Sequence, residues 1–127
     1  MVRADQVIVA LDILDVDRVL DLVDKLLPSG ICWFKVGVSL WTHAGKGVVD
    51  AIKQRGGRVF LDLKLHDIPH QVGLATSAAA ELGVDLLTVH ASGGAEMLKA
   101  AVAGAGDDMR LLAITVLTSL DLSLIHI

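Results

Sequence analysis

The stretch Arg58-Val-Phe-Leu-Asp-Leu-Lys-Leu-His-Asp-Ile-Pro69 decides how the rest of this 127-residue chain is interpreted. Its first eight residues predict a buried strand, because they are mainly apolar and lie between two glycines and a proline. Asp62 and Lys64 interrupt the strand near its C-terminal end and should lie side by side, since residues two apart share a face. Asp67 follows on the loop. Such charges form either a structural ion pair or a catalytic site, and spacing alone leaves both open.

Strands and helices alternate on both sides of this stretch. Further strands are expected at 6–11, 31–38, 84–90 and 110–117, and helices at 15–27, 40–54, 71–82 and 95–103. The helix at 15–27 has Asp15 as its expected N-cap. This alternation predicts a parallel sheet with right-handed crossovers. Two α/β architectures are compatible with it, a doubly wound open sheet and a (β/α)8 TIM barrel.

The positions of the polar residues favour the barrel. Six of them fall at or near the C-terminal ends of expected strands: Asp12, Lys35, Asp62, Lys64, His90 and Thr118. In a barrel these ends meet at one mouth, where the active site lies, whereas an open sheet would spread them along an edge. Such a barrel usually takes about 250 residues. We therefore predict a TIM barrel of which about the first five βα units are present, with residues 1–121 in this one domain.

Composition excludes several classes of function. Hydrophobic residues make up 54% and aromatic residues 3%, so the core must consist of aliphatic side chains, as in a buried parallel sheet. The net charge of −4, without a basic cluster, argues against a nucleic-acid partner. Cys32 is the single cysteine, and neither Cys nor His residues have metal-ligand spacing, so no metal is expected. Without a signal peptide or a long apolar segment, we expect a cytoplasmic protein with no membrane association.

Several polar residues allow more than one interpretation. Lys35 either extends to solvent from its apolar strand or pairs with Asp62 on the neighbouring strand. Asp12 is either a cap at the strand end or a substrate contact at the mouth. Gly45-Lys-Gly47 lacks the remaining residues of a phosphate loop and is more typical of a loose helix start. Ser92-Gly-Gly94 is typical of a helix cap, although its backbone N–H groups offer a place for an anion.

Five segments together resemble one enzyme family. They are Val9-Ala-Leu-Asp12, Lys35-Val-Gly37, Phe60-Leu-Asp-Leu-Lys-Leu-His-Asp-Ile-Pro69, Val89-His-Ala-Ser-Gly-Gly94 and Ile114-Thr-Val-Leu-Thr-Ser119. In this order, over residues 7–121, they resemble orotidine 5'-phosphate decarboxylase. The pattern Asp-x-Lys-x-x-Asp is shared with related sugar-phosphate decarboxylases and aldolases. His-Asp-Ile-Pro and Thr-Val-Leu-Thr-Ser favour the orotidylate enzyme.

The resemblance implies a reaction and a dimer. The reaction would be the decarboxylation of orotidylate to uridylate in pyrimidine biosynthesis, without a cofactor. The enzyme would be a homodimer with sites at the interface, where Asp67 and Ile68 reach the partner's site. The catalytic residues implied are Asp62, Lys64 and Asp67, in an alternating charge network with Lys35.

The resemblance also implies a role for each group. Asp62 would face the substrate carboxylate, and Lys64 would stabilise the developing carbanion and protonate it. Asp12 and Lys35 would hold the ribose hydroxyls, and Thr118, together with Ser119, would contact the pyrimidine. The full set of implied substrate-binding residues is Asp12, Lys35, Asp62, Leu63, Lys64, Leu65, His66, Asp67, Ile68, Pro69, His70, Gln71 and Thr118.

The pattern departs from the family in two respects. The phosphate-binding elements of the family lie on later strands, beyond this chain. Residues 122–127 continue neither the resemblance nor a helix, and we expect them to be a non-native tail. Two alternatives therefore stay open. One is a sugar-phosphate decarboxylase or aldolase, although Leu61 stands where a metal-binding Glu would favour those relatives. The other is an inactive half barrel with open strand edges.

Overall fold

A computed structural model describes residues 1–120 of the chain. Its centre is one parallel sheet in which each strand pairs with the next strand along the chain. The strands are β1 (Ile8–Ala10), β2 (Trp33–Gly37), β3 (Arg58–Leu65), β4 (Leu86–His90) and β5 (Arg110–Ile114). The sheet order is therefore β1-β2-β3-β4-β5.

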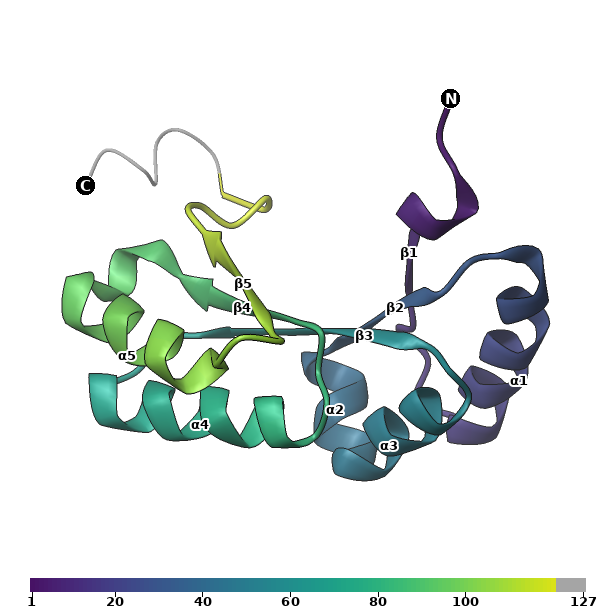
Figure 1. Ribbon diagram of the computed structural model, residues 1–127, viewed down its shortest axis with the longest axis horizontal. Helices are drawn as coiled ribbons and strands as arrows, with labels where there is room; N and C mark the ends of the chain where they lie inside the picture. Colours follow the sequence, from purple (N-terminus) through teal and green to yellow (C-terminus); the bar gives the residue numbers. More distant parts are fainter. Residues whose placement is uncertain (121–127) are drawn as a thin grey trace.

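The helices that connect these strands lie along one side of the sheet (Figure 1). They are α1 (Val16–Leu26), α2 (Val38–Ala44), α3 (Lys46–Gln54), α4 (Pro69–Glu81) and α5 (Ala95–Ala105). A doubly wound sheet would reverse its strand order and carry helices on both faces. Because the order here never reverses, the prediction of a barrel is confirmed, with its first five strands present. β1 and β5 rise on the side away from α3 and α4, as the wall of a barrel does (Figure 1).

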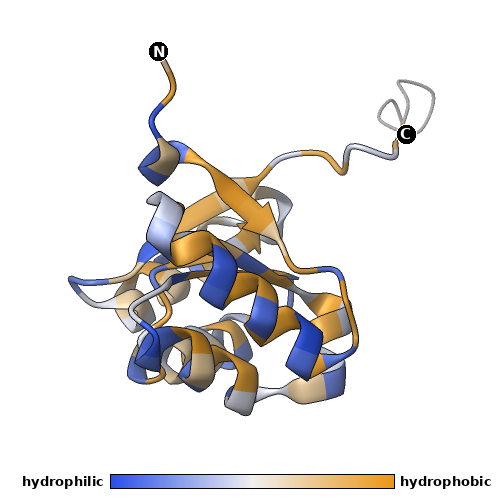
Figure 2. Ribbon diagram, turned by 90° about the vertical axis from the view of Figure 1, so that its right-hand side faces the viewer, coloured by the Kyte–Doolittle hydropathy of each residue, from blue (hydrophilic) through white to orange (hydrophobic). Residues whose placement is uncertain are grey.

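The hydrophobic core lies between the sheet and these helices. The strands are mainly apolar, whereas the helices alternate apolar and polar residues (Figure 2). Among the largest fully buried side chains are Phe34 on β2, Leu40 on α2, Ile52 on α3 and Leu61 on β3. Burying each of these contributes about 1.5–3 kcal/mol. One face of β3 is therefore occupied by the core, and the charged residues of this strand must lie on the other face.

Two helix starts follow from single residues. Asp15 is the N-cap of α1 as predicted, since its Oδ1 accepts the N–H of Arg18 at 3.2 Å. Pro69 is the first residue of α4, so this helix begins two residues before the predicted start at Gln71. Proline fits that position because the first turn of a helix needs no N–H donor there. The residues after β3 therefore pass almost directly into a helix.

Two predicted elements are wrong in their extent. The single helix expected at 40–54 is two helices, α2 and α3, because Gly45 between them has φ of 60° and ψ of −142°. Few residues other than glycine adopt such a backbone conformation. The strand expected at 110–117 ends at Ile114, and the polar Thr-Ser segment after it forms turns instead.

Two further expectations concern membrane association and the C-terminal tail. Within residues 1–120, no helix combines the length and the apolar character that crossing a bilayer requires. The tail expected at 122–127 lies outside the described residues. The structure therefore bears on the domain only up to residue 120.

Candidate active site

A bulge in β3 positions the charged residues of the opening stretch. Leu61 pairs with Leu87 of β4 and Leu65 pairs with Val89, so β3 advances four residues where β4 advances two. Within this bulge Lys64 has φ of 47°, which is uncommon for a residue other than glycine. The regular alternation that we predicted for β3 is therefore wrong at Lys64. The prediction that its charge lies beside that of Asp62 is nevertheless confirmed.

Asp62 is the centre of an ion-pair network. Its Oδ2 lies 3.0 Å from Nζ of Lys64 and 3.8 Å from Nζ of Lys35, which comes from β2. Its Oδ1 accepts a hydrogen bond from Oγ1 of Thr88, on β4, at 2.8 Å. The side chain of Asp62 is 12% exposed, so the carboxylate is largely removed from water. Of the two interpretations of Lys35, pairing with Asp62 is the one confirmed.

This network keeps Asp62 ionised. Burial by itself would raise the pKa of Asp62, but the hydrogen bonds from Lys64 and Thr88 and the positive charges of Lys64 and Lys35 outweigh it. The result is a pKa below the ordinary value of this carboxyl group. A carboxylate that stays charged in a poorly hydrated place repels any other anion brought close to it. The site therefore combines a fixed negative charge with two neighbouring cations.

Lys35, Asp62 and Lys64 line a cleft together with the end of β5 and the residues that follow it. We call it the inner cleft; its volume is about 490 Å³, and it is lined by Lys35, Asp62, Lys64, Ile114, Val116, Leu117, Thr118 and Ser119. Thr118 and Ser119, predicted to contact a substrate ring, thus share one cleft with the ion-pair network. Lys35 and Lys64 come from neighbouring strands, so the lining combines residues that are distant in sequence.

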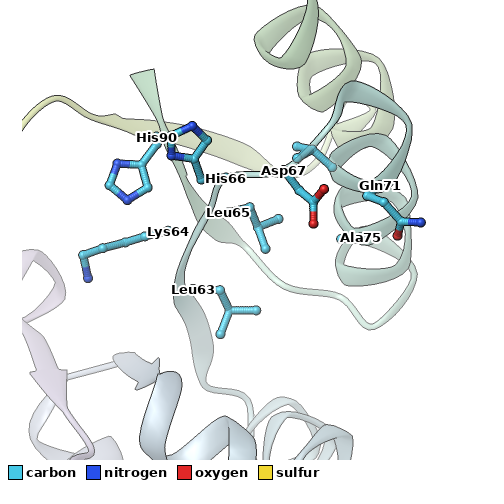
Figure 3. Close-up of a pocket in the computed structure, with 9 residues that line it drawn as sticks. Leu63, Lys64, Leu65, His66, Asp67, Gln71, Ala75 and His90 are labelled. Atoms are coloured by element: carbon cyan, nitrogen blue, oxygen red, sulfur yellow. The ribbon is translucent and has the colours of Figure 1, made fainter. Parts of the chain in front are cut away.

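Lys64 also lines a second hollow, next to α4. We call it the outer hollow; its volume is about 390 Å³, and its lining consists of Leu63, Lys64, Leu65, His66, Asp67, Gln71, Val72, Ala75 and His90. Lys64 and the two histidine rings lie on one side of the strand, and Asp67 and Gln71 lie toward α4 (Figure 3). The two rings have centroids 5.1 Å apart. Six predicted residues, from Leu63 to Asp67 together with Gln71, therefore gather here.

Asp67 is not part of the ion-pair network of its own chain. Its carboxylate points away from Lys64 (Figure 3), and its Oδ1 accepts the N–H of Ile68 at 2.7 Å. Ile68 is 62% exposed and borders no hollow with Lys64. Both residues are therefore exposed in the single chain and stand apart from its ion-pair network.

The remaining predicted residues lie around these two cavities. Asp12 is exposed after β1, with its Oδ1 3.6 Å from the place that a Cβ atom on Gly37, at the end of β2, would occupy. Pro69 and His70 line a shallow apolar groove between α4 and α5, together with Gly73, Leu74, Ala100, Ala103 and Gly104. The structure therefore places neither Pro69 nor His70 in the inner cleft. Among residues 1–120, no three His, Cys, Asp or Glu side chains gather as a metal site would require.

Sequence reasoning missed Thr88. This residue is fully buried, and its hydroxyl both donates to Asp62 and accepts the backbone N–H of Lys64 at 2.9 Å. The available signal was a lone hydroxyl in the apolar run Leu86-Leu-Thr-Val-His90, two residues before a strand-end histidine. A buried hydroxyl needs a partner, and the nearest polar groups on the neighbouring strand are those of the charged site.

Fold and site together define a class of protein. It is a β/α barrel with a lysine-aspartate-lysine network, built on adjacent strands and facing the mouth at their C-terminal ends. The chain belongs to the orotidine 5'-phosphate decarboxylase / HUMPS family, whose family model matches residues 5–124. The family that the motifs resemble is thereby confirmed.

Relatives with known names agree with this assignment. The orotidine 5'-phosphate decarboxylases of Moorella thermoacetica and Sodalis glossinidius are 48% and 50% identical to this chain, over 92% and 91% of its length. The crystal structure of orotidine 5'-phosphate decarboxylase from Lactobacillus acidophilus superposes with a TM-score of 0.86 at 39% identity, covering 94% of this chain and 57% of that one. The chain spans about half the length of the curated relatives it matches.

Proposed function

We propose that this chain, within a complete barrel, is an orotidine 5'-phosphate decarboxylase that converts orotidylate to uridylate and CO2. The observation that carries the proposal is the carboxylate of Asp62, held ionised between Lys64 and Lys35 at the inner cleft. Two relatives that are 48% and 50% identical to this chain are named orotidine 5'-phosphate decarboxylases, which supports the same reaction. The arrangement suits a decarboxylation because it offers both an anion to repel the substrate carboxylate and a cation to receive the charge left behind.

The proposed chemistry needs only side chains of the site. The bond between the pyrimidine ring and its carboxylate breaks, CO2 leaves, and the electron pair stays on the ring carbon. The ammonium group of Lys64 stabilises this carbanion and then donates a proton to it, which leaves uridylate and a neutral amine. Repulsion by Asp62 raises the energy of the bound carboxylate. We assign the larger share of the rate acceleration to carbanion stabilisation, because only interactions that strengthen in the transition state accelerate the reaction.

Further residues in and around the two cavities would bind the nucleotide. Asp12 and Lys35 would hold the ribose hydroxyls, and Thr118 and Ser119 would contact the pyrimidine. The position of both Thr118 and Ser119 on the lining of the inner cleft supports this assignment. The phosphate would bind to elements beyond this chain, and its binding energy would help to drive the reaction at the ring.

We further propose that the protein works as a homodimer in which Asp67 and Ile68 enter the partner's site. Asp67 is exposed, and its carboxylate points away from Lys64 of its own chain, which supports this arrangement. Exposed apolar side chains follow it in the chain, since Ile68 is 62% exposed and Leu74, which lines the apolar groove between α4 and α5, is 55% exposed. Exposed apolar side chains gathered on one surface are typical of an interface.

The runner-up function, a sugar-phosphate decarboxylase or aldolase, has less support. It would be favoured by a metal-binding carboxylate immediately before Asp62. Leu61 occupies that position and is 1% exposed, with its side chain in the hydrophobic core. A carboxylate there would be buried without a partner, at a large cost in free energy.

The proposal is tested with the protein encoded by the whole reading frame that contains this chain, which we call the complete protein. The decrease in orotidylate absorbance measures turnover, and a sugar phosphate assayed in parallel measures the runner-up reaction. We expect turnover of orotidylate without an added cofactor. Turnover of the sugar phosphate alone would contradict the proposal. The 127-residue chain by itself should show no turnover, because five strands do not close a barrel.

A further inference from the structure

The interrupted ladder between β3 and β4 leaves backbone groups that need new partners. Between Leu61 and Leu65 the register of β3 against β4 shifts, and the N–H of Lys64 donates to a side chain of β4. The hydroxyl of Thr88 accepts this N–H at 2.9 Å. Lys64 is also the residue with positive φ, a conformation that persists only where its surroundings hold it. Thr88 is therefore the side chain from the neighbouring strand that holds this backbone conformation.

The same hydroxyl also fixes the carboxylate of Asp62. It donates to Oδ1 at 2.8 Å, while Nζ of Lys64 contacts Oδ2 at 3.0 Å. Rotation of the carboxylate would break both contacts at once. Thr88 is fully buried and lines neither the inner cleft nor the outer hollow, so it does not touch what binds there.

We propose that Thr88 is a positioning residue for the reaction, because one buried hydroxyl holds both the Asp62 carboxylate and the bulge that aims Lys64. This inference rests on the proposed function for its kinetic consequence. A hydroxyl donating to a carboxylate is one of the stronger neutral-to-charged hydrogen bonds. Its loss should loosen the geometry of the two reacting groups without removing a contact to the substrate.

Two substitutions in the complete protein separate this role from simple packing. Thr88→Val keeps the shape and removes the hydroxyl, whereas Thr88→Ser keeps the hydroxyl and removes a methyl group. We expect Thr88→Val to lower kcat by about 10- to 100-fold, the range for one hydrogen bond to a charged group, with little change in KM. Thr88→Ser should stay within a few-fold of the wild type. A packing role predicts the opposite order, with Val close to the wild type and Ser impaired, and that order would overturn the inference.

Thr76 offers a matched control. It is also fully buried, on α4, but its Oγ1 has no hydrogen-bond partner within residues 1–120. Thr76→Val therefore makes the same chemical change without removing a hydrogen bond, and its kcat should equal that of the wild type. Equal kcat values for Thr88→Val and Thr76→Val would also overturn the inference.

A second readout does not depend on turnover. The titration of the Asp62 carboxyl, followed by 13C NMR, reports its hydrogen bonds directly, with Lys35 on β2 and Lys64 on β3 as the charged groups that face it. The pKa of Asp62 should rise in Thr88→Val and stay low in Thr88→Ser. Unchanged titration in both would refute the positioning role. If the wild-type complete protein lacked decarboxylase activity while the two variants still showed this titration pattern, the proposed function alone would fail.

Discussion

At the scale of single residues, the site depends on keeping a buried carboxylate charged. Asp62 loses hydration on burial, and the hydrogen bonds from Lys64 and Thr88 together with the positive charges of Lys64 and Lys35 compensate for that loss. Isolated burial would favour the neutral acid, which neither repels an anion nor orients an ammonium group. The arrangement therefore links the fold to the charge state of one side chain.

The lowered pKa of Asp62 predicts how stability depends on pH. Its folded-state pKa lies below the ordinary 3.8, so ionised Asp62 stabilises the folded protein above about pH 3.8, and this stabilisation is lost as pH falls toward the folded-state pKa. Asp62→Asn removes this dependence. In the complete protein, the free energy of unfolding should therefore fall less steeply between about pH 5 and pH 2 in the variant.

Urea unfolding at a series of pH values measures this difference. Asp107→Asn, at an exposed position after α5, serves as the control and should follow the wild type. Parallel curves for Asp62→Asn and the wild type over the acidic range would show that the carboxylate is not stabilised by its neighbours.

At the scale of elements, much of the fold was predictable because the hydrophobic pattern of each strand and helix lies within a short stretch of sequence. Apolar runs located the five strands seen in residues 1–120, helical periodicity located the helices, and the choice of a barrel followed from the polar residues at strand ends. The bulge in β3 was not predictable, because it arises from the pairing of β3 with β4 and from the hydroxyl of Thr88. The break at Gly45 was visible only as a weakness in the expected helix, since a glycine permits a positive φ without requiring it.

The packing of α4 against α5 predicts which glycine cannot be replaced. A Cβ atom on Gly104 would lie 2.7 Å from the backbone oxygen of Gly73 and 3.1 Å from the backbone nitrogen of Ser77. Because backbone atoms cannot turn aside as side chains do, Gly104→Ala in the complete protein should force the helices apart. We expect a loss of about 1–3 kcal/mol in the free energy of unfolding.

Gly73 on the facing helix is the control for this prediction. A Cβ atom there would meet Ala100 at 3.6 Å, an ordinary contact. Gly73→Ala should leave stability unchanged or raise it by up to about 1 kcal/mol, because alanine favours the helix. Thermal unfolding measures the stability of both variants. Equal stability of the two would contradict the close approach of α4 and α5.

At the scale of the whole molecule, the site is divided in two. Lys35, Asp62, Lys64 and Thr118 meet within one chain, and this part of the site could be predicted because parallel strands end at one edge. Asp67 lies apart from them, as an exposed carboxylate on the loop after β3. Its proposed role in the partner's site came from the resemblance, since no pattern within one chain reports on a second chain.

Mixing two inactive variants tests that division. In a homodimer with shared sites, Lys64→Ala and Asp67→Ala should each abolish most turnover on its own. When the two complete proteins are unfolded together and refolded, mixed dimers contain one site with both defects and one site with neither. We therefore expect turnover to recover in the mixture. If Asp67 served its own chain, both sites of a mixed dimer would stay defective and the mixture would remain inactive.

The most direct test of the central claim is the turnover of Lys64→Ala in the complete protein. Lys64 is the proposed proton donor and the cation that stabilises the carbanion, so we expect kcat for orotidylate to fall by at least about 10²- to 10⁴-fold. Lys99→Ala, which removes an exposed lysine from α5, is the matched control and should keep wild-type turnover. A Lys64→Ala protein that formed uridylate as fast as the Lys99→Ala protein would contradict the account.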